Sequence, residues 1–190
     1  GPRSSCSRAG TGGAGGNTGS GVAGVACNVS LLPLKIADRY GSLSVSAIVA
    51  AHDYATMMRG RGVNIVASNN SYGGFAPAFY ANAPTGFDAE KDAIERFIQS
   101  GATFVAAAGN SAFDNDNPDN TFFPTSYNIP GLIAVAATDN ADALAGFSNW
   151  GARTVDLGAP GVGVFTTAIN SGYTFIDGTS FSSPTVAGAV

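Results

Sequence analysis

A twelve-residue stretch near the C-terminus carries the residue types of a serine nucleophile. The stretch reads DGTSFSSPTVAG from Asp177 to Gly188. Gly178 has no side chain, so a substrate backbone can come close to this point of the chain. Ser180 falls where irregular chain changes to a helical pattern, so we expect its hydroxyl to project from a helix N-terminus, whose dipole favours developing negative charge. Pro184 fits a first helical turn, where a missing N–H costs little.

A serine-rich helix start is the simpler interpretation of Gly178-Thr179-Ser180 taken alone. The remaining nine residues of the stretch, together with more distant motifs, favour the nucleophile. One of these is Gly109-Asn110, which follows a buried apolar run and by itself would be an ordinary turn. Another is Ser71-Tyr72-Gly73, at the end of the strand-like stretch that begins at Asn64.

Alternating strand-like and helix-like segments predict a parallel α/β sheet that would position these residues. Apolar runs predict strands at Val29–Ile36, Val63–Ala67, Thr103–Ala108 and Leu132–Ala137. Helical spacing predicts helices near Ser46–Arg59 and Glu90–Gln99. Catalytic groups in such sheets gather at the carboxyl ends of the strands. Both Ser71-Tyr72-Gly73 and Gly109-Asn110 fall at such ends.

The stretch around Ser180 resembles the nucleophile motif of subtilisin-like serine proteases, and the resemblance extends from about Ala9 to Val190. The other stretches that resemble the motifs of this family are Leu34–Ser44, Asn64–Gly74, Thr103–Asn110, Phe147–Gly151 and Val155–Gly161. The resemblance implies a three-layer α/β fold with a mostly parallel central sheet and helices on both faces. A flavodoxin-like nucleotide-binding module also fits the element order, but no glycine-rich phosphate loop follows a strand.

The resemblance also implies site residues for peptide hydrolysis. Ser180 would be the nucleophile, and Asn110 would stabilise the oxyanion through its amide. Extended substrate would bind along Gly41, Ser42, Leu43, Ser71, Tyr72, Gly73, Ala107, Ala108 and Gly109. Leu43 stands where the family often has glycine, so the outer substrate subsites depart from the family's pattern at this residue.

The slot for the residue before the cleaved bond would lie between Ser71–Gly73 and Ala107–Gly109. The second wall has only small side chains and no fixed charge. Such a slot gains from apolar burial, at roughly 25 cal/mol per Å². The sequence therefore predicts a preference for large apolar or aromatic residues, unless the Tyr72 ring narrows the slot.

The chain has a single histidine, His52, inside the predicted helix at Ser46–Arg59. A subtilisin-like triad appears in the chain order Asp, His, Ser, and the resemblance implies that this helix follows the catalytic histidine. We therefore expect His52 and Asp53 to be a pair on the helix surface and not the catalytic base. Counting back from Ala9-Gly10-Thr11, the histidine position falls on Ser4, within a start that does not resemble the motif.

These gaps predict that the 190 residues are one partial peptidase domain, truncated at both ends, with an atypical start at residues 1–8. The chain by itself would lack the catalytic Asp and His and would be inactive. The alternative is a pseudoenzyme that binds extended peptides without cleaving them.

Composition limits the partners. Charged residues make up 12% of the chain and the net charge is −4, so we expect no nucleic-acid partner. No apolar run is long enough to cross a membrane, so we expect no membrane partner. The resemblance implies protein or peptide substrates, and we expect a monomer. The resemblance implies a secreted protein. Cys6 and Cys27 leave a disulfide possible but unsupported.

The proposed chemistry needs no cofactor, but structural calcium is a possibility. Residues 114–120 are rich in Asp and Asn oxygens, which suit calcium. A solvated turn is the more ordinary interpretation of such a cluster. The resemblance suggests a second calcium loop near residues 15–19.

Overall fold

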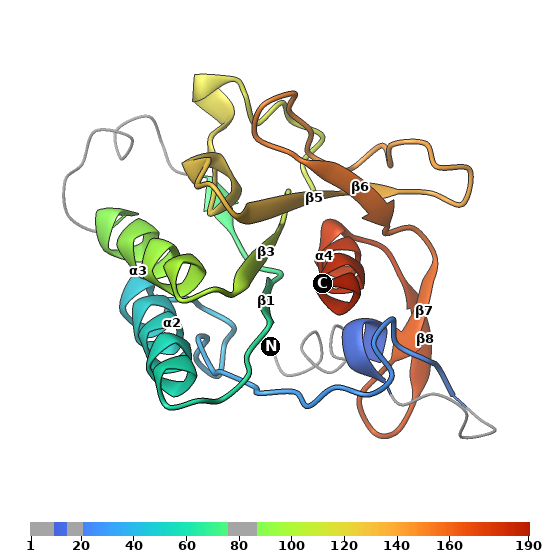
Figure 1. The fold of residues 1–190 in the computed structure, drawn as a ribbon. Helices are drawn as coiled ribbons and strands as arrows, with labels where there is room; N and C mark the ends of the chain where they lie inside the picture. Colours follow the sequence, from blue (N-terminus) through green and yellow to red (C-terminus); the bar gives the residue numbers. More distant parts are fainter. Residues whose placement is uncertain (1–9, 15–20, 76–86) are drawn as a thin grey trace.

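The computed structural model describes residues 10–14, 21–75 and 87–190. A four-stranded parallel sheet forms the middle layer, in the strand order β1 (Ala67–Asn70), β3 (Thr103–Ala107), β5 (Leu132–Thr138) and β6 (Leu157–Pro160). Helices α2 (Val45–Gly60) and α3 (Phe87–Gln99) cover one face, and α4 (Thr179–Ala189) covers the other (Figure 1). The expected three-layer α/β fold with helices on both faces is confirmed.

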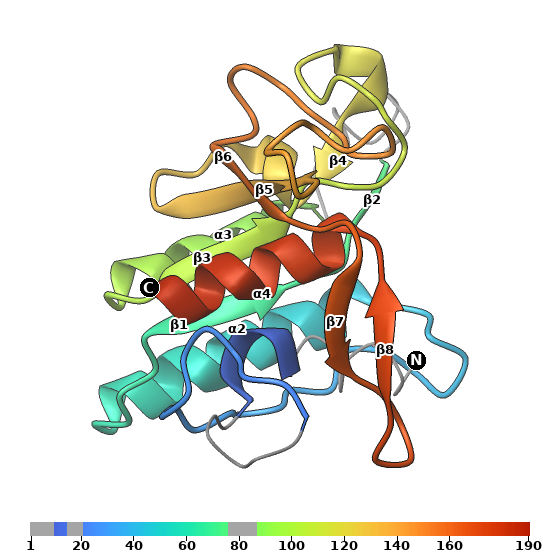
Figure 2. The ribbon, with the colours of Figure 1, turned by 90° about the vertical axis from the view of Figure 1, so that its right-hand side faces the viewer.

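Smaller elements surround the carboxyl edge of this sheet. Strand β2 (Gly74–Phe75) pairs antiparallel with β4 (Phe122–Phe123), and β7 (Val164–Thr167) pairs antiparallel with β8 (Tyr173–Ile176). The β7–β8 hairpin leads directly into α4 (Figure 2). Two single-turn 3₁₀ helices, η2 (Pro118–Asn120) and η3 (Thr125–Tyr127), flank β4.

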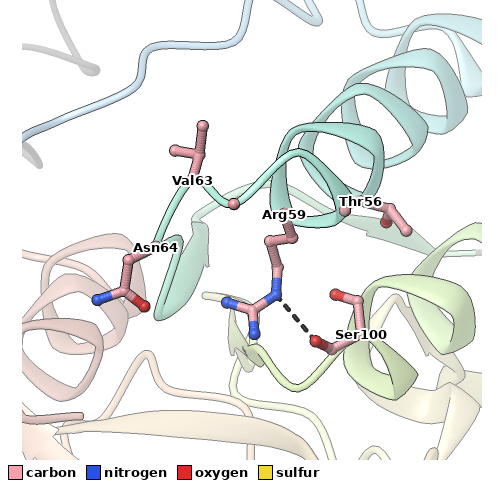
Figure 3. Close-up of a pocket in the computed structure, with 7 residues that line it drawn as sticks. Thr56, Arg59, Val63, Asn64 and Ser100 are labelled. Atoms are coloured by element: carbon pink, nitrogen blue, oxygen red, sulfur yellow. Dashed lines mark hydrogen bonds between the residues drawn. The ribbon is translucent and has the colours of Figure 1, made fainter.

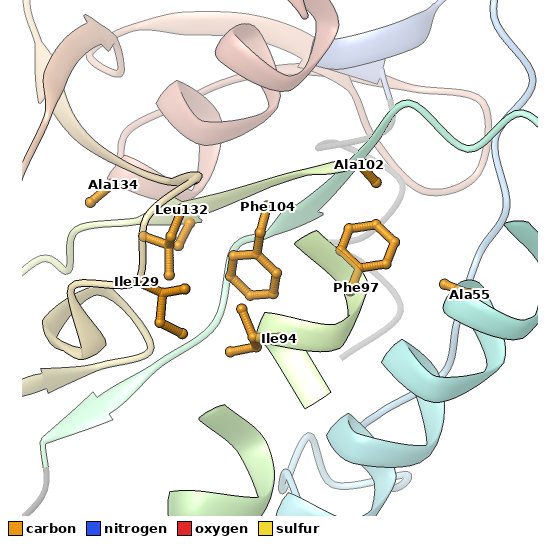
Figure 4. Packing of buried hydrophobic residues seen from close by; sticks show 9 residues of the cluster. Ala55, Ile94, Phe97, Ala102, Phe104, Ile129, Leu132 and Ala134 are labelled. Carbon is orange, nitrogen blue, oxygen red and sulfur yellow. The ribbon is translucent and has the colours of Figure 1, made fainter. Parts of the chain in front are cut away.

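The larger apolar cluster lies between α2, α3 and the sheet. Ile94 and Phe97 of α3 and Phe104 of β3 are fully buried there (Figure 4). Apolar residues at helical spacing give α3 one buried face. Strands β3 and β5 are covered on both faces, which explains why their sequences are continuous apolar runs and not alternating ones.

Strand β1 begins later than the sequence predicts, at Ala67 and not at Val63. The residues just after α2 form hydrogen bonds with the end of that helix. The Val63 N–H donates to the Met58 carbonyl at 3.1 Å, and the Arg59 guanidinium donates to the Ile65 carbonyl. Ladder pairing with β3 therefore starts only at Ala67, opposite Thr103.

The predicted strand at Val29–Ile36 is wrong. These residues are exposed, with Leu31 at 56%, and they belong to no sheet. A strand needs a neighbour to pair its N–H and C=O groups, and no described segment pairs with this one; the nearest bridge, from Ala37 to Leu43, comes just after it. Within the described ranges, no helix is long and apolar enough to cross a membrane.

Candidate active site

Ser180 is the second residue of α4 and is half-buried at the helix start. Gly178 is the N-cap with φ 143°, a backbone angle that favours glycine. Its N–H donates to the Gly161 carbonyl at 2.8 Å, which ties the turn to the end of β6. Neither the N–H nor the hydroxyl of Ser180 bonds to any described residue, so both remain available to a ligand.

Asn110 follows the end of β3 and is joined to the residue before Ser180. Its Oδ1 accepts hydrogen bonds from the N–H and the hydroxyl of Thr179, both at 2.9 Å. The Thr179 hydroxyl in turn accepts from the Gly109 N–H at 3.3 Å. The Asn110 oxygen thus faces Thr179. The NH₂ of the same amide donates to no described residue.

The geometry brings two unpaired donors, the Ser180 N–H and the Asn110 NH₂, to one helix N-terminus beside an unpaired hydroxyl. Backbone N–H groups and the helix dipole at such a terminus favour an anion. The arrangement can therefore stabilise negative charge that develops next to the Ser180 hydroxyl.

Pro184 is the sixth residue of α4, not part of its first turn as the sequence predicts. Proline has no N–H, so it cannot donate to the carbonyl four residues earlier, which is that of Ser180. The Ser71 hydroxyl supplies the missing donor and reaches the Ser180 carbonyl at 2.9 Å. The end of β1 therefore completes the backbone hydrogen bonding of the residue that carries the candidate nucleophile.

Further hydrogen bonds fix α4 against the strands. Ser183, fully buried, donates to Asn69 Oδ1 at 2.6 Å. Ser182, also fully buried, donates to the Pro160 carbonyl at 3.3 Å. These contacts attach the first half of α4 to β1 and β6 by directional bonds, which set its position along the sheet.

Two buried asparagines support the Asn110 turn. Asn149 Oδ1 accepts from the Ser111 N–H at 2.8 Å, and its Nδ2 donates to Asn115 Oδ1 at 3.0 Å. Asn115 Nδ2 donates to the Ala108 carbonyl at 2.9 Å. Buried amides must be paired, but nothing in the spacing of the two residues indicates that they meet.

The two expected substrate walls lie side by side. Strands β1 and β3 are parallel neighbours with Asn70 opposite Ala106, so Ser71–Gly73 and Ala107–Gly109 leave the sheet at the same edge. The Tyr72 hydroxyl is buried and has no partner among the described residues. Burial raises its pKa well above the usual value, and the nearby Glu90 carboxyl of α3 adds to this rise.

Glu90 is a buried carboxyl, 4% exposed, that accepts a hydrogen bond from the Tyr127 hydroxyl at 2.9 Å. Burial raises its pKa, and the Tyr127 bond offsets part of the rise. The tip of Tyr72 therefore lies in a buried environment that also holds a carboxyl group.

Gly41–Leu43 form a tight turn outside the sheet. Asp38 Oδ1 accepts from the N–H groups of Tyr40 at 2.8 Å and Ser42 at 2.9 Å, and Gly41 has φ 87°. Leu43, 42% exposed, pairs with Ala37 by a single antiparallel bridge. Substrate binding along this turn stays a prediction.

His52 belongs to α2, which lies on the other side of the sheet from α4 (Figure 1). It is 5% exposed, its Nδ1 is 2.9 Å from the Ile48 carbonyl, and its ring contacts those of Phe97 and Phe104. Burial lowers its pKa, and the Ile48 bond offsets part of that change.

The expected surface pair of His52 and Asp53 is wrong. Neighbouring residues of a helix point in directions about 100° apart, so His52 turns inward while Asp53 stays exposed and bonds Arg96 at 2.7 Å. Ser4, where the family's histidine was placed by counting, lies outside the described residues, as does Cys6.

Several side-chain oxygens at residues 114–120 accept hydrogen bonds from within the protein. Asp114 Oδ1 accepts from the Asp116 N–H at 2.9 Å, and Asn117 Oδ1 accepts from the Asp119 N–H at 3.0 Å. Asp116 accepts from the Thr154 N–H and hydroxyl. No cluster of three metal-binding side chains occurs in the described part of the chain. Calcium stays a prediction, and the second suggested loop, at residues 15–19, is not among the described residues.

A pocket of 510 Å³ lies away from these residues, at the amino edge of the sheet (Figure 3). It is lined by residues that include Thr56, Arg59, Val63, Asn64 and Ser100. The Arg59 guanidinium is committed to backbone carbonyls, with Nε donating to that of Ser100 at 3.0 Å. The Arg59 side chain therefore joins the segments that follow α2 and α3 by hydrogen bonds. We assign the pocket no function.

Comparison with known proteins agrees with this geometry. Residues 7–190 match the model of the subtilase family, Peptidase S8. A solved structure described as a cold adapted subtilisin-like serine proteinase superposes with a TM-score of 0.76 and 31% identity, over 98% of this chain and 59% of the other. The chain therefore belongs to the subtilase family of serine endopeptidases.

Two sequence relatives are similar over most of the chain. Subtilisin DY of Bacillus licheniformis is 41% identical over 171 residues, which cover 90% of this chain and 56% of the relative. The thermophilic serine proteinase of Bacillus sp. (strain AK1) is 35% identical over 176 residues, 90% of this chain and 37% of the relative. The chain thus spans about half the length of these relatives, or less.

Proposed function

We propose that this chain is the nucleophile-bearing part of a serine endopeptidase that hydrolyses peptide bonds in extracellular proteins or peptides. The observation that carries the proposal is the site at the start of α4. There, an unpaired Ser180 hydroxyl lies beside two unpaired donors, the Ser180 N–H and the Asn110 NH₂. Family membership supplies the reaction class.

In this mechanism the Ser180 Oγ attacks the carbonyl carbon of the scissile peptide bond. The carbonyl oxygen becomes an oxyanion, and the Asn110 NH₂ and the Ser180 N–H donate hydrogen bonds to it. The amine leaves with a proton, and water then hydrolyses the acyl-enzyme. No cofactor takes part in these steps.

The serine must lose its proton to a base, and the 190 residues offer no suitable imidazole. His52, the single histidine, packs against the rings of Phe97 and Phe104, on the face of the sheet opposite to α4. We propose that the catalytic His and its orienting Asp come from residues outside this chain in the complete protein. The 190-residue chain alone should then show no turnover.

Substrate would bind as an extended strand beside the backbone of Ser71–Gly73, with Gly41–Leu43 on its other side. The side chain before the cleaved bond would enter between Ser71–Gly73 and Ala107–Gly109. Support comes from the parallel register of β1 and β3, which brings both walls to one edge. We propose a monomer that acts alone on its substrates.

The test compares the complete protein, its Ser180→Ala variant and the 190-residue chain on casein and on a chromogenic peptide. We expect turnover only by the complete protein, and a covalent adduct on Ser180 after treatment with a sulfonyl fluoride, located by mass spectrometry. Turnover by the 190-residue chain that Ser180→Ala abolishes would show that a base is present within it.

A peptide-binding domain without turnover is the second candidate, favoured by the buried position of His52. The coding sequence upstream of Gly1 separates the two candidates. A strand that carries Asp and a histidine motif there support the protease, whereas their absence, with peptide binding retained, supports the second candidate.

A further inference from the structure

The Phe122 ring lies against a glycine of each proposed wall of the substrate slot. A Cβ atom added to Gly73 would be 2.5 Å from Phe122 Cε1 and 2.7 Å from Phe122 Cζ. A Cβ added to Gly109 would be 3.2 Å from the same Cε1 atom. One edge of the ring therefore lies beside a glycine of each wall.

Three contacts fix the backbone of Phe122. Phe122 pairs with Phe75 in the β2–β4 ladder. Its N–H donates to the Ser126 hydroxyl at 3.0 Å, and its carbonyl accepts from the Thr125 hydroxyl at 2.7 Å. These bonds fix the point from which the side chain projects.

The ring of Phe122 is also packed. It stacks edge-on against the Phe75 ring, with centroids 5.1 Å apart, and Phe75 stacks in the same way on Phe113 at 5.4 Å. Aromatic pairs at these distances and angles are favourable. Moving the ring away from the walls would break the contact with Phe75.

We propose that Phe122 closes the slot and restricts the residue before the cleaved bond to a small one: Gly, Ala or Ser. This inference rests on the proposed function, because it takes Ser71–Gly73 and Ala107–Gly109 as the walls of that slot. It reverses the preference for large apolar residues that the wall residues alone predict. The space that a large substrate side chain needs is the space beside Gly73 and Gly109 that the ring occupies.

The experiment measures kcat/KM of the complete enzyme on peptides that differ only in the residue before the scissile bond: Ala, Leu or Phe. We expect the Ala peptide to be preferred over the Phe peptide by at least about tenfold. In Phe122→Ala, the ratio of the Phe rate to the Ala rate should rise at least about tenfold, because removal of the ring opens the slot.

Phe113→Ala is the matched control, since it removes a ring of the same cluster that is not among the atoms nearest to a Cβ added at Gly73 or Gly109. Its Phe-to-Ala rate ratio should stay within about threefold of that of the unmodified enzyme. Phe122→Leu, which keeps an apolar group in the β2–β4 contact, gives an intermediate ratio and replaces Phe122→Ala if that variant does not fold. Equal or faster cleavage of the Phe peptide by the unmodified enzyme overturns the proposal, as does an unchanged ratio in the Phe122 variants.

Peptide binding separates this proposal from the proposed function. Peptides that end in Ala, Leu or Phe with a free carboxylate resemble cleavage products and need no catalysis to bind. Calorimetry should show that the Ala peptide binds more tightly than the Phe peptide, and that Phe122→Ala reverses the order. If no peptide is cleaved but this reversal occurs, the proposed function fails and the slot proposal stands. If no peptide binds, or if the order does not change, the slot proposal fails.

Discussion

The layer between the sheet and α2 and α3 is apolar, whereas the interface between the sheet and the first half of α4 is polar. The first holds Ile94, Phe97 and Phe104, each fully buried. The second holds Thr179, Ser182 and Ser183, also fully buried, and each of these donates a hydrogen bond to a strand end or to the turn after it. The first half of α4 also buries Phe181 and Pro184. In its second half, Val186 and Ala187 pack against the apolar cluster of Val105, Val135 and Ala159.

The difference follows from what each interface must do. Apolar burial is strong but non-directional, so it stabilises α2 and α3 without fixing a side chain to a fraction of an ångström. Hydrogen bonds are directional, so they can fix the position of α4 relative to the strand ends. Substitutions in the apolar layer should therefore change stability alone, whereas those in the polar interface that act on Ser180 or Asn110 should also change catalysis.

The largest effect on stability is expected from Phe97→Ala in the apolar layer. Loss of a fully buried phenylalanine leaves a cavity and lowers the free energy of unfolding by about 3–5 kcal/mol. Urea denaturation followed by circular dichroism measures this change, and kcat of the folded fraction should stay constant. A large fall in kcat with stability preserved would contradict the division between the two layers.

Asn110→Asp is the most specific test in the polar interface, because it removes a hydrogen-bond donor and keeps the shape of the side chain. The aspartate keeps the oxygen that accepts from Thr179 but has no NH₂ to donate. We expect kcat to fall by roughly 10²–10³-fold or more, the magnitude known for the oxyanion asparagine of a subtilisin, with little loss of stability. Steady-state kinetics and thermal unfolding test the two parts separately. A kcat within threefold or so of the unmodified enzyme would exclude Asn110 as a donor.

Ser71→Ala should affect both properties moderately. It leaves the Ser180 carbonyl, which Pro184 cannot serve, without its donor, and an unpaired buried carbonyl costs about 1–3 kcal/mol. We expect a lower free energy of unfolding together with a lower kcat, because Ser180 is no longer held from β1. Ser183→Ala removes a hydroxyl of α4 that does not contact Ser180, and it should lower stability while leaving kcat nearly unchanged. Equal effects of both variants on kcat would argue against a positioning role for Ser71.

The smallest effect is a pH dependence of stability that His52 produces. Because burial lowers the pKa of His52 from its usual 6.5, the unfolded chain binds a proton more readily than the folded protein does. The contribution of His52 is therefore fully present above pH 6.5 and is lost as the pH falls through the lowered value. The free energy of unfolding, measured by denaturation at pH 8 and pH 5, should differ less between the two pH values in His52→Gln than in the unmodified protein. The substitution should not alter the dependence of the catalytic rate on pH in the range where the protein is folded. A large loss of activity with folding intact would reopen His52 as the base.

The sequence predicts the sheet and the site edge well because buried parallel strands have a strong local pattern. The runs at Thr103–Ala108 and Leu132–Ala137 are apolar enough to be covered on both faces, and these strands are neighbours in the sheet. Since parallel strands end at one edge, the sequence places Gly109-Asn110 near Ser71 without any knowledge of contacts.

What the sequence misses depends on partners distant in the chain. Val29–Ile36 has a strand-like composition, but no described segment pairs with it. The contact between Asn115 and Asn149 and the supply of a donor from Ser71 to the Ser180 carbonyl join residues far apart in sequence. The position of the Phe122 ring depends on the β2–β4 ladder, whose two-residue strands are too short to produce a periodic signal.

Thr179 contacts both Asn110 and Gly109 and immediately precedes Ser180, and this has a consequence for motion. When α4 shifts slightly in thermal fluctuation, the amide bonded to Thr179 is carried along with the serine that follows it in the chain. We therefore expect the distance between the Ser180 hydroxyl and the Asn110 NH₂ to vary less than the distance from either group to the rest of the sheet.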